Sequence, residues 1–170
     1  MKRFIGIAAL FVLMISAGEA QNLKFGHINS DELIRALPEF DTANSNLERY
    51  RQELINILEL MSVELNNKSD AFNKESKNLT DVVRQVKEQE LIDLNRRIQD
   101  FQVNAQEQLQ NKQVELFQPI YSKVEKAIKD VGKENGFLYV FDIAKGSLLY
   151  FDETKSTNIL ALTKAKLGLK

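Results

Sequence analysis

Two long runs of residues with the repeat of an α-helix decide the fold of this protein. Residues 41–65 read DTANSNLERYRQELINILELMSVEL, and residues 81–109 read DVVRQVKEQELIDLNRRIQDFQVNAQEQL. In both runs apolar residues recur mainly at steps of three and four, which places them on one face of a helix. They are Leu47, Tyr50, Leu54, Ile57, Met61 and Leu65 in the first run, and Val83, Val86, Leu94, Ile98, Phe101, Ala105 and Leu109 in the second.

The break between the two runs is predicted at Asn78–Thr80. Thr80 is a suitable N-cap residue, and an acidic residue such as Asp81 is favourable at a helix N-terminus. No glycine occurs from residue 41 to residue 131, and the single proline there, Pro119, is expected to kink the second helix. Two helices of about 35 residues would each be about 50 Å long.

A chain of 170 residues cannot surround rods of that length with a globular core. We therefore predict an antiparallel helical hairpin, residues 41–119, that projects from a small body. The body is formed by residues 21–40 and 120–170, the two ends of the mature chain. The predicted fold class is α+β, mostly α: a long antiparallel helical hairpin, or coiled-coil arm, on a small β-containing oligomerisation body.

The body is predicted to contain strands near both ends of the chain. Residues 23–29 alternate loosely and predict a short strand, followed by a helical turn at Glu32–Leu37 capped by Ser30 or Asp31. Gly132 and Gly136 end the second long helix. A final helix carries Ile159, Leu160, Leu162 and Leu167 after a cap at Asp152, Thr157 or Asn158.

Two apolar runs near the C-terminus, Phe137–Phe141 and Leu148–Phe151, are predicted to pair as a β-hairpin across the turn residues 142–147. Both runs are apolar on both faces, which is typical of strands covered on two sides. One chain of this size has few elements to cover them. Oligomerisation through the body would supply the cover. The predicted interface residues are Phe25, Ile28, Leu138, Val140, Leu148 and Tyr150.

The N-terminus has the organisation of a secretory signal peptide. Lys2 and Arg3 precede an apolar run over residues 4–15, and small residues at Gly18 and Ala20 favour cleavage before Gln21. The alternative is an uncleaved anchor, but the run is shorter than the roughly 20 apolar residues of a spanning helix. We predict residues 1–20 to be removed and the mature protein to be periplasmic, with no stable membrane insertion.

The composition argues against several classes of function. The formal net charge is −1, and removing residues 1–20 leaves 21 basic and 23 acidic side chains, a net charge of −2. This balance predicts no nucleic-acid partner. There is no cysteine and a single histidine, His27, which is expected to be structural. No phosphate-loop, nucleophile-elbow or metal-ligand pattern is present. We predict a protein that is not an enzyme and uses neither a cofactor nor a metal.

The candidate binding surface is the outer region of the hairpin. Little protein is available there to bury apolar side chains, so they could hold an unfolded client through several weak contacts. The alternative is ordinary packing between the two helices. The candidate client-binding residues are Phe72, Leu79, Val82, Val83, Val86 and Phe101, with Ile92 further along the second helix.

Several segments in a fixed order resemble the Skp/OmpH family of periplasmic chaperones. The resemblance covers essentially the whole mature chain, and no single segment is diagnostic. Its carriers are residues 24–30 (KFGHINS), Glu32-Leu33, Leu37-Pro38-Glu39, residues 87–91 (KEQEL), residues 116–120 (LFQPI) and residues 136–142 (GFLYVFD).

The resemblance implies a trimer shaped like a jellyfish. Its body would be built from strands near Phe25–Asn29, Phe137–Asp142 and Leu148–Asp152. Three hairpins would enclose a cavity that holds unfolded outer-membrane β-barrel proteins without ATP. The well-known members are strongly basic, whereas this chain is slightly acidic. We therefore do not transfer the family's lipopolysaccharide site to this chain.

Two hypotheses from different classes follow. The first is an ATP-independent holdase for outer-membrane proteins in transit. The second is a structural coiled-coil spacer or adaptor of the cell envelope. A pure spacer would keep an unbroken apolar repeat and a polar tip. Here the polar residues 66–69 interrupt the apolar repeat after Leu65, and apolar residues lie near the tip. Both features favour the holdase.

Overall fold

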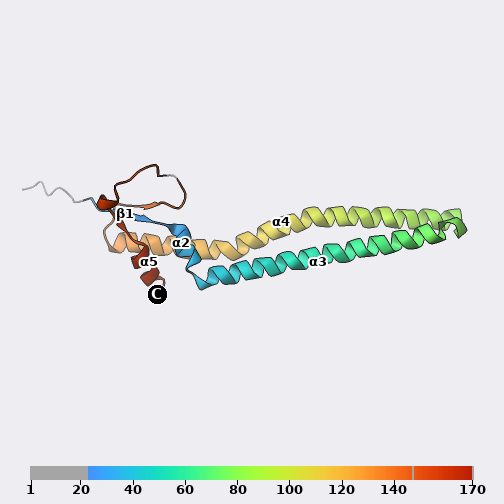
Figure 1. Cartoon of the computed structure of the whole chain (residues 1–170), viewed down its shortest axis with the longest axis horizontal. Helices are drawn as coiled ribbons and strands as arrows, with labels where there is room; N and C mark the ends of the chain where they lie inside the picture. Colours follow the sequence, from blue (N-terminus) through green and yellow to red (C-terminus); the bar gives the residue numbers. More distant parts are fainter. Residues whose placement is uncertain (1–22, 147, 170) are drawn as a thin grey trace, which may run out of the picture.

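The computed structural model describes residues 23–146 and 148–169. Two long helices lie side by side and project from a small body at one end (Figure 1). They are α3, Pro38–Glu75, and α4, Asp81–Glu134. At 1.5 Å per residue these helices are about 57 Å and about 81 Å long. The predicted fold class, a mostly helical chain with a long hairpin on a small β-containing body, is confirmed.

The two helices turn at the predicted position. A short 3₁₀ helix, η1 (Ser76–Asn78), follows α3, and Thr80 is the N-cap of α4. The Thr80 hydroxyl accepts a hydrogen bond from the backbone N–H of Val83 at 3.4 Å. The cap satisfies one of the free N–H groups at the start of a helix, which explains why α4 begins here.

The second helix passes through Pro119 without ending. Its ribbon bends in the yellow part, toward the body (Figure 1). A proline inside a helix lacks the N–H donor and crowds the preceding turn, so a bend at this position is expected. Beyond the bend α4 becomes part of the body and stops before Gly136, whose φ of 68° is the left-handed conformation of a helix C-terminus.

A three-stranded parallel sheet forms the centre of the body. Its strands are β1 (Phe25–Ile28), β2 (Tyr139–Asp142) and β3 (Ser156–Asn158), in the order β2-β1-β3. In the register, Gly26 lies opposite Val140 on one side and opposite Thr157 on the other. The strand nearest the N-terminus is therefore central.

The predicted β-hairpin is wrong. β2 pairs with β1, and the chain then crosses to the far side of β1 before it forms β3, so both neighbours run parallel to β1. A parallel arrangement cannot be closed by a tight turn. Residues 148–151 belong to this crossing connection, which also contains the 3₁₀ helix η2 (Glu153–Lys155), and form no strand. The third body strand lies at residues 156–158 instead of 148–152.

Two short helices complete the body. α2 (Ser30–Arg35) is capped by Asn29, whose side-chain oxygen accepts a hydrogen bond from the N–H of Glu32, and not by Ser30 or Asp31. α5 (Leu160–Lys166) starts beside Asn158, which accepts a hydrogen bond from the N–H of Leu160. The body is defined here as the sheet with the connection between β2 and β3, α2, α5 and the part of α4 that follows Pro119.

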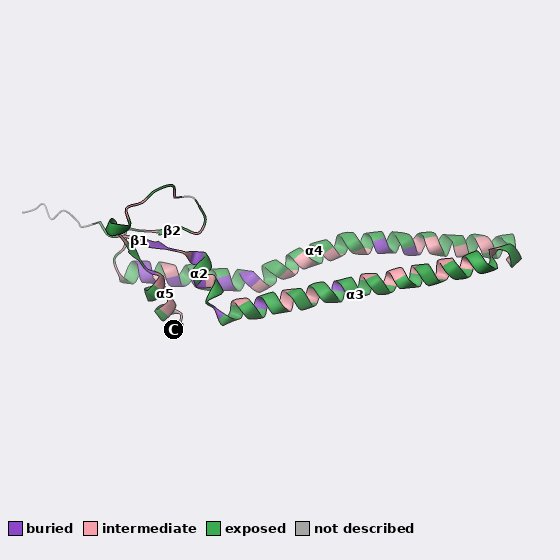
Figure 2. Cartoon of the chain, viewed as in Figure 1, coloured by how far each residue is buried: buried purple, intermediate pink, exposed green. Residues whose placement is uncertain are grey.

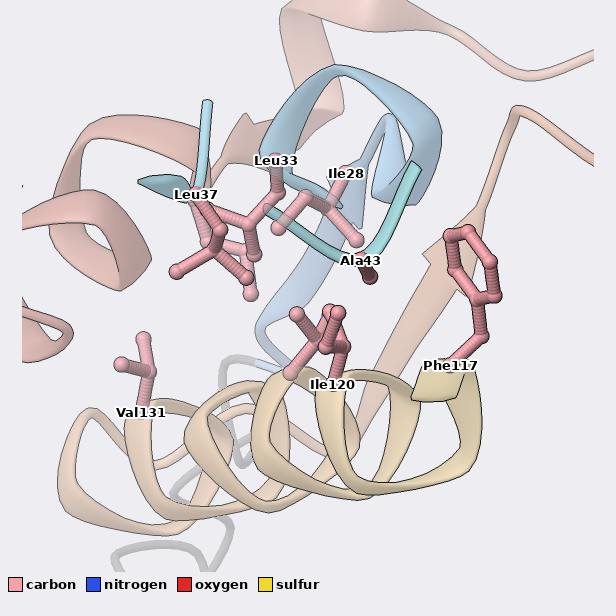
Figure 3. Packing of buried hydrophobic residues seen from close by; sticks show 9 residues of the cluster. Ile28, Leu33, Leu37, Ala43, Phe117, Ile120 and Val131 are labelled. Carbon is pink, nitrogen blue, oxygen red and sulfur yellow. The ribbon is translucent and has the colours of Figure 1, made fainter. Parts of the chain in front are cut away.

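One hydrophobic core holds the body to the base of the arms. Side chains of α4 point toward side chains of β1, α2 and the start of α3 (Figure 3). Burial of apolar surface is the main stabilising contribution in such a core. Its buried residues are Ile28, Leu33, Leu37, Ala43, Phe117, Ile120, Val124, Val131 and Ile159.

Replacing Gly26 by valine is expected to lower the free energy of unfolding by about 1–3 kcal/mol. A Cβ atom at this position would lie 3.2 Å from the Phe137 ring and 3.3 Å from side-chain atoms of Val140 and Ile159. These neighbours come from both sides of the central strand, so they cannot all move away. Urea unfolding measures the loss, and Gly132→Ala, where a Cβ atom would be in ordinary contact with Val140 at 3.6 Å and the backbone is not left-handed, is the control.

Candidate functional site

The arms are thinly packed in comparison with the body. Buried residues gather in the body and at the base of the arms, whereas the outer arms are mostly exposed or intermediate (Figure 2). Beyond Ala43 on α3 and before Phe117 on α4, the buried arm residues are Leu54, Leu94 and Ile98. Ile57, expected on the inner stripe, is exposed. Two helices packed through so few buried side chains leave much of their apolar surface accessible.

The candidate residues near the tip divide into two groups. Val82, Val83 and Val86 are exposed, and Val82 and Val86, four residues apart, lie on neighbouring positions of one helix face. Phe72 and Leu79 are partly buried. Phe101, farther along α4, is also partly buried and follows Leu94 by seven residues, which places it toward α3. The valines therefore offer the more accessible apolar surface.

Two ion pairs join the helices in the outer arms. Lys68 of α3 pairs with Glu90 of α4, and Lys87 of α4 pairs with Glu75 of α3 at 3.3 Å. The hydrogen bond between Lys68 and Glu90 raises the pKa of Lys68 and lowers the pKa of Glu90. All four side chains are solvent-accessible, where ion pairs contribute little stability. They set the alignment of the helices more than they strengthen the contact.

Sequence analysis missed two exposed valines in the middle of α4. Val103 and Val114 lie between the tip and the body, and neither belongs to the stripe that faces α3. The signal that could have found them is their separation of eleven residues, which also separates Val103 from Ile92. Ile92, Val103 and Val114 are all exposed.

A groove of about 730 Å³ lies on the body between α2, α4 and β2. Its apolar lining includes Ile34, Val124, Ile128, Leu138 and Val140. The same lining contains the charged residues Asp31, Glu125, Lys129, Lys133, Asp142 and Lys145. An apolar groove with a charged rim is a typical surface for another protein chain.

The predicted interface residues differ in how far they are exposed to solvent. Leu138 and Tyr150 are exposed, and Leu138 and Val140 line the groove. Phe25, Val140 and Leu148 are partly buried. Ile28 is only 1% exposed and belongs to the core of the chain. A second copy cannot contact it while this fold persists, so Ile28 supports the surface from beneath.

The segment that fails to form a strand is the most exposed apolar part of the body. Leu149 is fully exposed, and its neighbour Tyr150 is nearly so. Phe151 turns inward and lies against His27, with the ring centroids 4.8 Å apart. An extended apolar segment beside a sheet with an open β2 edge provides further surface for association.

Asp142 joins β2 to the start of α2. Its carboxylate accepts hydrogen bonds from the Ser30 N–H at 3.2 Å, the Ser30 hydroxyl at 2.5 Å and the Ala144 N–H at 3.1 Å. Partial burial by itself would raise the pKa of Asp142, but the hydrogen bonds from Ser30 and Ala144 and the nearby charge of Lys145 together lower it. The Asp142 carboxylate therefore holds the end of β2 to the start of α2 at one end of the groove.

His27 has a structural environment, as expected. It is buried on the central strand, and its Nδ1 lies 2.9 Å from the Ser156 hydroxyl of β3. In the part of the chain that the structure describes, no group of three or more acidic or histidine side chains could hold a metal ion. Among the same residues, no helix combines the length and apolarity needed to cross a membrane. The predicted signal peptide, residues 1–20, lies outside the described residues.

The geometry defines a class of protein in which a small sheet-containing body carries one long helical hairpin with exposed apolar residues. Comparison with known proteins identifies the family. The model of the family described as outer membrane protein (OmpH-like) matches residues 24–167, so the chain belongs to this family. The chain is also similar to an uncharacterized protein of Aquifex aeolicus (strain VF5), with 30% identity over 155 residues, 90% of this chain and 89% of the relative.

Membership in the OmpH-like family supports a chaperone-type role in the cell envelope at the level of the family. It also supports outer-membrane proteins as the kind of partner. The relative carries no described function and adds only the family likeness.

Proposed function

We propose that this chain is an ATP-independent holdase that binds unfolded outer-membrane β-barrel proteins and prevents their aggregation. The protein works in the periplasm after removal of residues 1–20. Three copies associate through their bodies, and their arms surround a cavity that receives one client. The surface near the arm tips, with Phe72, Leu79 and Val82, contributes to client binding together with Val83, Val86 and Phe101.

The observation that carries this proposal is the exposure of separated apolar side chains along arms that project from the body. Val82 and Val86 near the tip and Val103 and Val114 farther in are all exposed. Full burial of one such side chain is worth about 1.5–3 kcal/mol. Several partial contacts can therefore hold a client, while no single contact forces the client into one conformation.

The body supplies the surfaces for association. The groove between α2, α4 and β2, the open edge of β2 and the exposed side chains of Leu149 and Tyr150 lie on the same small unit. Packing of these surfaces against other copies would cover apolar area that one chain leaves exposed. Association of three copies would also place three pairs of arms near one another.

Native mass spectrometry of residues 21–170 tests the proposal. The protein is measured alone and after a urea-unfolded outer-membrane β-barrel protein has been diluted into it, and light scattering records aggregation of the client. We expect a trimer that binds one client and suppresses the scattering. A trimer that ignores the client would instead support the spacer or adaptor, and a monomer would contradict the proposed assembly.

Client binding is expected to depend little on salt. From Lys68 to Arg97 the chain has seven basic and six acidic residues, so the outer arms have no strong net charge. Screening by salt acts mainly on interactions between exposed charges. The client dissociation constant measured at low and moderate salt should therefore change by less than about threefold, whereas a charge-driven holdase would show a steep slope.

A further inference from the structure

We propose that the face of α4 that carries Ile92, Val103, Val114 and Tyr121 is a binding surface for unfolded, largely uncharged polypeptide segments. This inference rests on the proposed holdase function and assigns its client contacts to a particular helix face. We name this surface the α4 outer face. Apart from Ile92, its residues are not among those that the sequence pattern suggested.

The four residues lie on one side of the helix by their spacing. They are separated by eleven, eleven and seven residues, and eleven residues complete three turns with about 20° to spare. All four are exposed, whereas Leu94 and Ile98, which belong to the side facing α3, are buried. α3 runs along the other side of α4 throughout the arm (Figure 1), so it cannot cover this face.

The spaces between the apolar residues are filled mainly by amide side chains. Gln99, Gln106 and Gln110 are exposed and lie three to seven residues from Val103, on the same side of the helix. From residue 101 to residue 111 the only charged residue is Glu107. Lys112, which follows this segment, is paired with Glu115 at 2.8 Å. Between Ile92 and Val103 the same side carries Arg96, four residues after Ile92, which pairs with Asp93 at 2.6 Å. The stretch from Val103 to Val114 is therefore the least charged part of this face.

This pattern does not fit a helical partner. Packing between helices needs an apolar contact at every third or fourth residue, and here the contacts are about 10 to 16 Å apart along the helix. An unfolded chain differs from a helix, because its peptide N–H and C=O groups are not hydrogen-bonded to one another and its apolar side chains are irregularly spaced. Glutamine amides both donate and accept hydrogen bonds, so they suit exposed backbone. The occupant that matches is an extended client segment with apolar side chains.

The outward side of α3 differs in charge. Its exposed apolar residues are Ile55, Leu60 and Val63, and the acidic residues Glu53, Glu59 and Glu64 lie among them. An apolar client segment placed there would desolvate carboxylates without replacing their hydrogen bonds. The α3 side therefore serves as an internal control with similar apolar exposure: Leu60 is 69% exposed and Val103 is 72% exposed.

The α4 outer face also leads into the body groove. Tyr121 follows Val114 by seven residues and lines the groove, as does Ile128 a further seven residues along. Copies that associate through the groove would hence approach one another on this side of α4. The binding face would then border the space between the copies.

A pair of matched triple variants tests the inference. Ile92→Gln/Val103→Gln/Val114→Gln changes the α4 outer face, and Ile55→Gln/Leu60→Gln/Val63→Gln changes α3. Glutamine is a good helix former and all six side chains are exposed, so both variants should keep the helicity and assembly of the wild type. The probe is the same urea-unfolded outer-membrane β-barrel protein, and its dissociation constant is measured by fluorescence quenching.

The α4 variant is expected to bind the client about tenfold or more weakly, because it loses three apolar contacts. The α3 variant should stay within about twofold of the wild type. Equal binding by the α4 variant and the wild type, or equal losses in both variants, would overturn the inference while leaving the holdase function intact. Failure of the wild type to bind the client would overturn the function and the inference together.

Site-specific crosslinking gives an independent measurement. A photoreactive phenylalanine analogue at Gln106, on the α4 outer face, should crosslink to the client. The same analogue at Asn67, an exposed position on α3, should give little product. Crosslinks that are stronger at Asn67 than at Gln106 would place the client on the other helix and overturn the assignment.

Discussion

Replacing Leu33 by alanine is expected to lower the free energy of unfolding of the body by about 2–5 kcal/mol. Leu33 lies on α2 with 0% of its surface exposed, in the core it shares with Ile28, Leu37 and Ile120. Truncation leaves a cavity in a body that has few other buried side chains. Because the body positions the arms, the loss should also weaken client binding.

Hydrogen exchange followed by mass spectrometry measures this effect separately in the body and in the arms. Amides of β1 and α2 should exchange faster in the Leu33→Ala variant, while amides in the middle of α3 and α4 should change little. Leu162→Ala is the matched control, since Leu162 is a body leucine with an exposed side chain. Protein concentration must be the same in all samples, because association alters apparent stability. Equal exchange in β1 of the variant and the wild type would contradict the importance of this core.

Replacing Asp142 by asparagine is expected to cost about 1.5–3 kcal/mol at neutral pH, the usual worth of a hydrogen bond to a charged group. Asparagine has one acceptor oxygen in place of two and lacks the charge. The Ser30 hydroxyl, which now donates to the second oxygen of Asp142, would face an amide N–H₂ there and lose its charge-assisted hydrogen bond. Ser30 is itself buried, so an unmet donor there is costly. Urea unfolding at pH 7 measures the loss.

The same variant should change the response to acid. The pKa of Asp142 is lowered in the folded state, so the carboxylate stabilises the fold above its ordinary unfolded pKa of about 3.9. This contribution is lost as the pH falls through the lowered pKa of the folded state. The stability difference between wild type and Asp142→Asn should therefore be full near pH 7 and narrow below about pH 4. A difference that stays constant to pH 2 would contradict this assignment.

Asp152→Asn provides the comparison for both measurements. Asp152 also accepts two hydrogen bonds, from the N–H and hydroxyl of Thr154, but these join residues only two apart in an exposed loop. Asp142 instead joins residues 112 positions apart. The control variant should therefore lose much less stability, since its contacts form within one turn of the chain.

The helical hairpin could be predicted because its determinants are local. Apolar residues at steps of three and four, the absence of glycine and the Thr80 cap all act within a few residues of one another. The thinning of the apolar stripe also predicted arms with little buried surface. Val82 is exposed, as the pattern favoured, whereas the exposure of Val83 and Val86, which the pattern placed on the apolar stripe, depends on how α3 and α4 align. The partial burial of Phe72 and Leu79 depends on the same alignment.

The topology of the sheet could not be predicted in the same way. The run at residues 148–151 has the composition of a strand, yet the strand forms at Ser156–Asn158, which is short and polar. The backbone of β1 offers hydrogen-bonding groups on two sides, and the path of the chain decides which segments reach them. The composition of residues 148–151 therefore indicated a segment suited to association, but it could not show which segment pairs with β1.

The sequence by itself determined the two arms and the turn between them, because helix periodicity and capping are short-range effects. Tertiary structure alone decided that β1 is the central strand, that Ile28 is buried within the chain, and that one side of α4 is uncovered. The central place of β1 depends on contacts between residues more than a hundred positions apart, and the uncovered side of α4 depends on the packing of α3 against α4. The eleven-residue spacing of the valines was present in the sequence, but it acquired meaning only once α3 was seen to occupy the opposite side of α4.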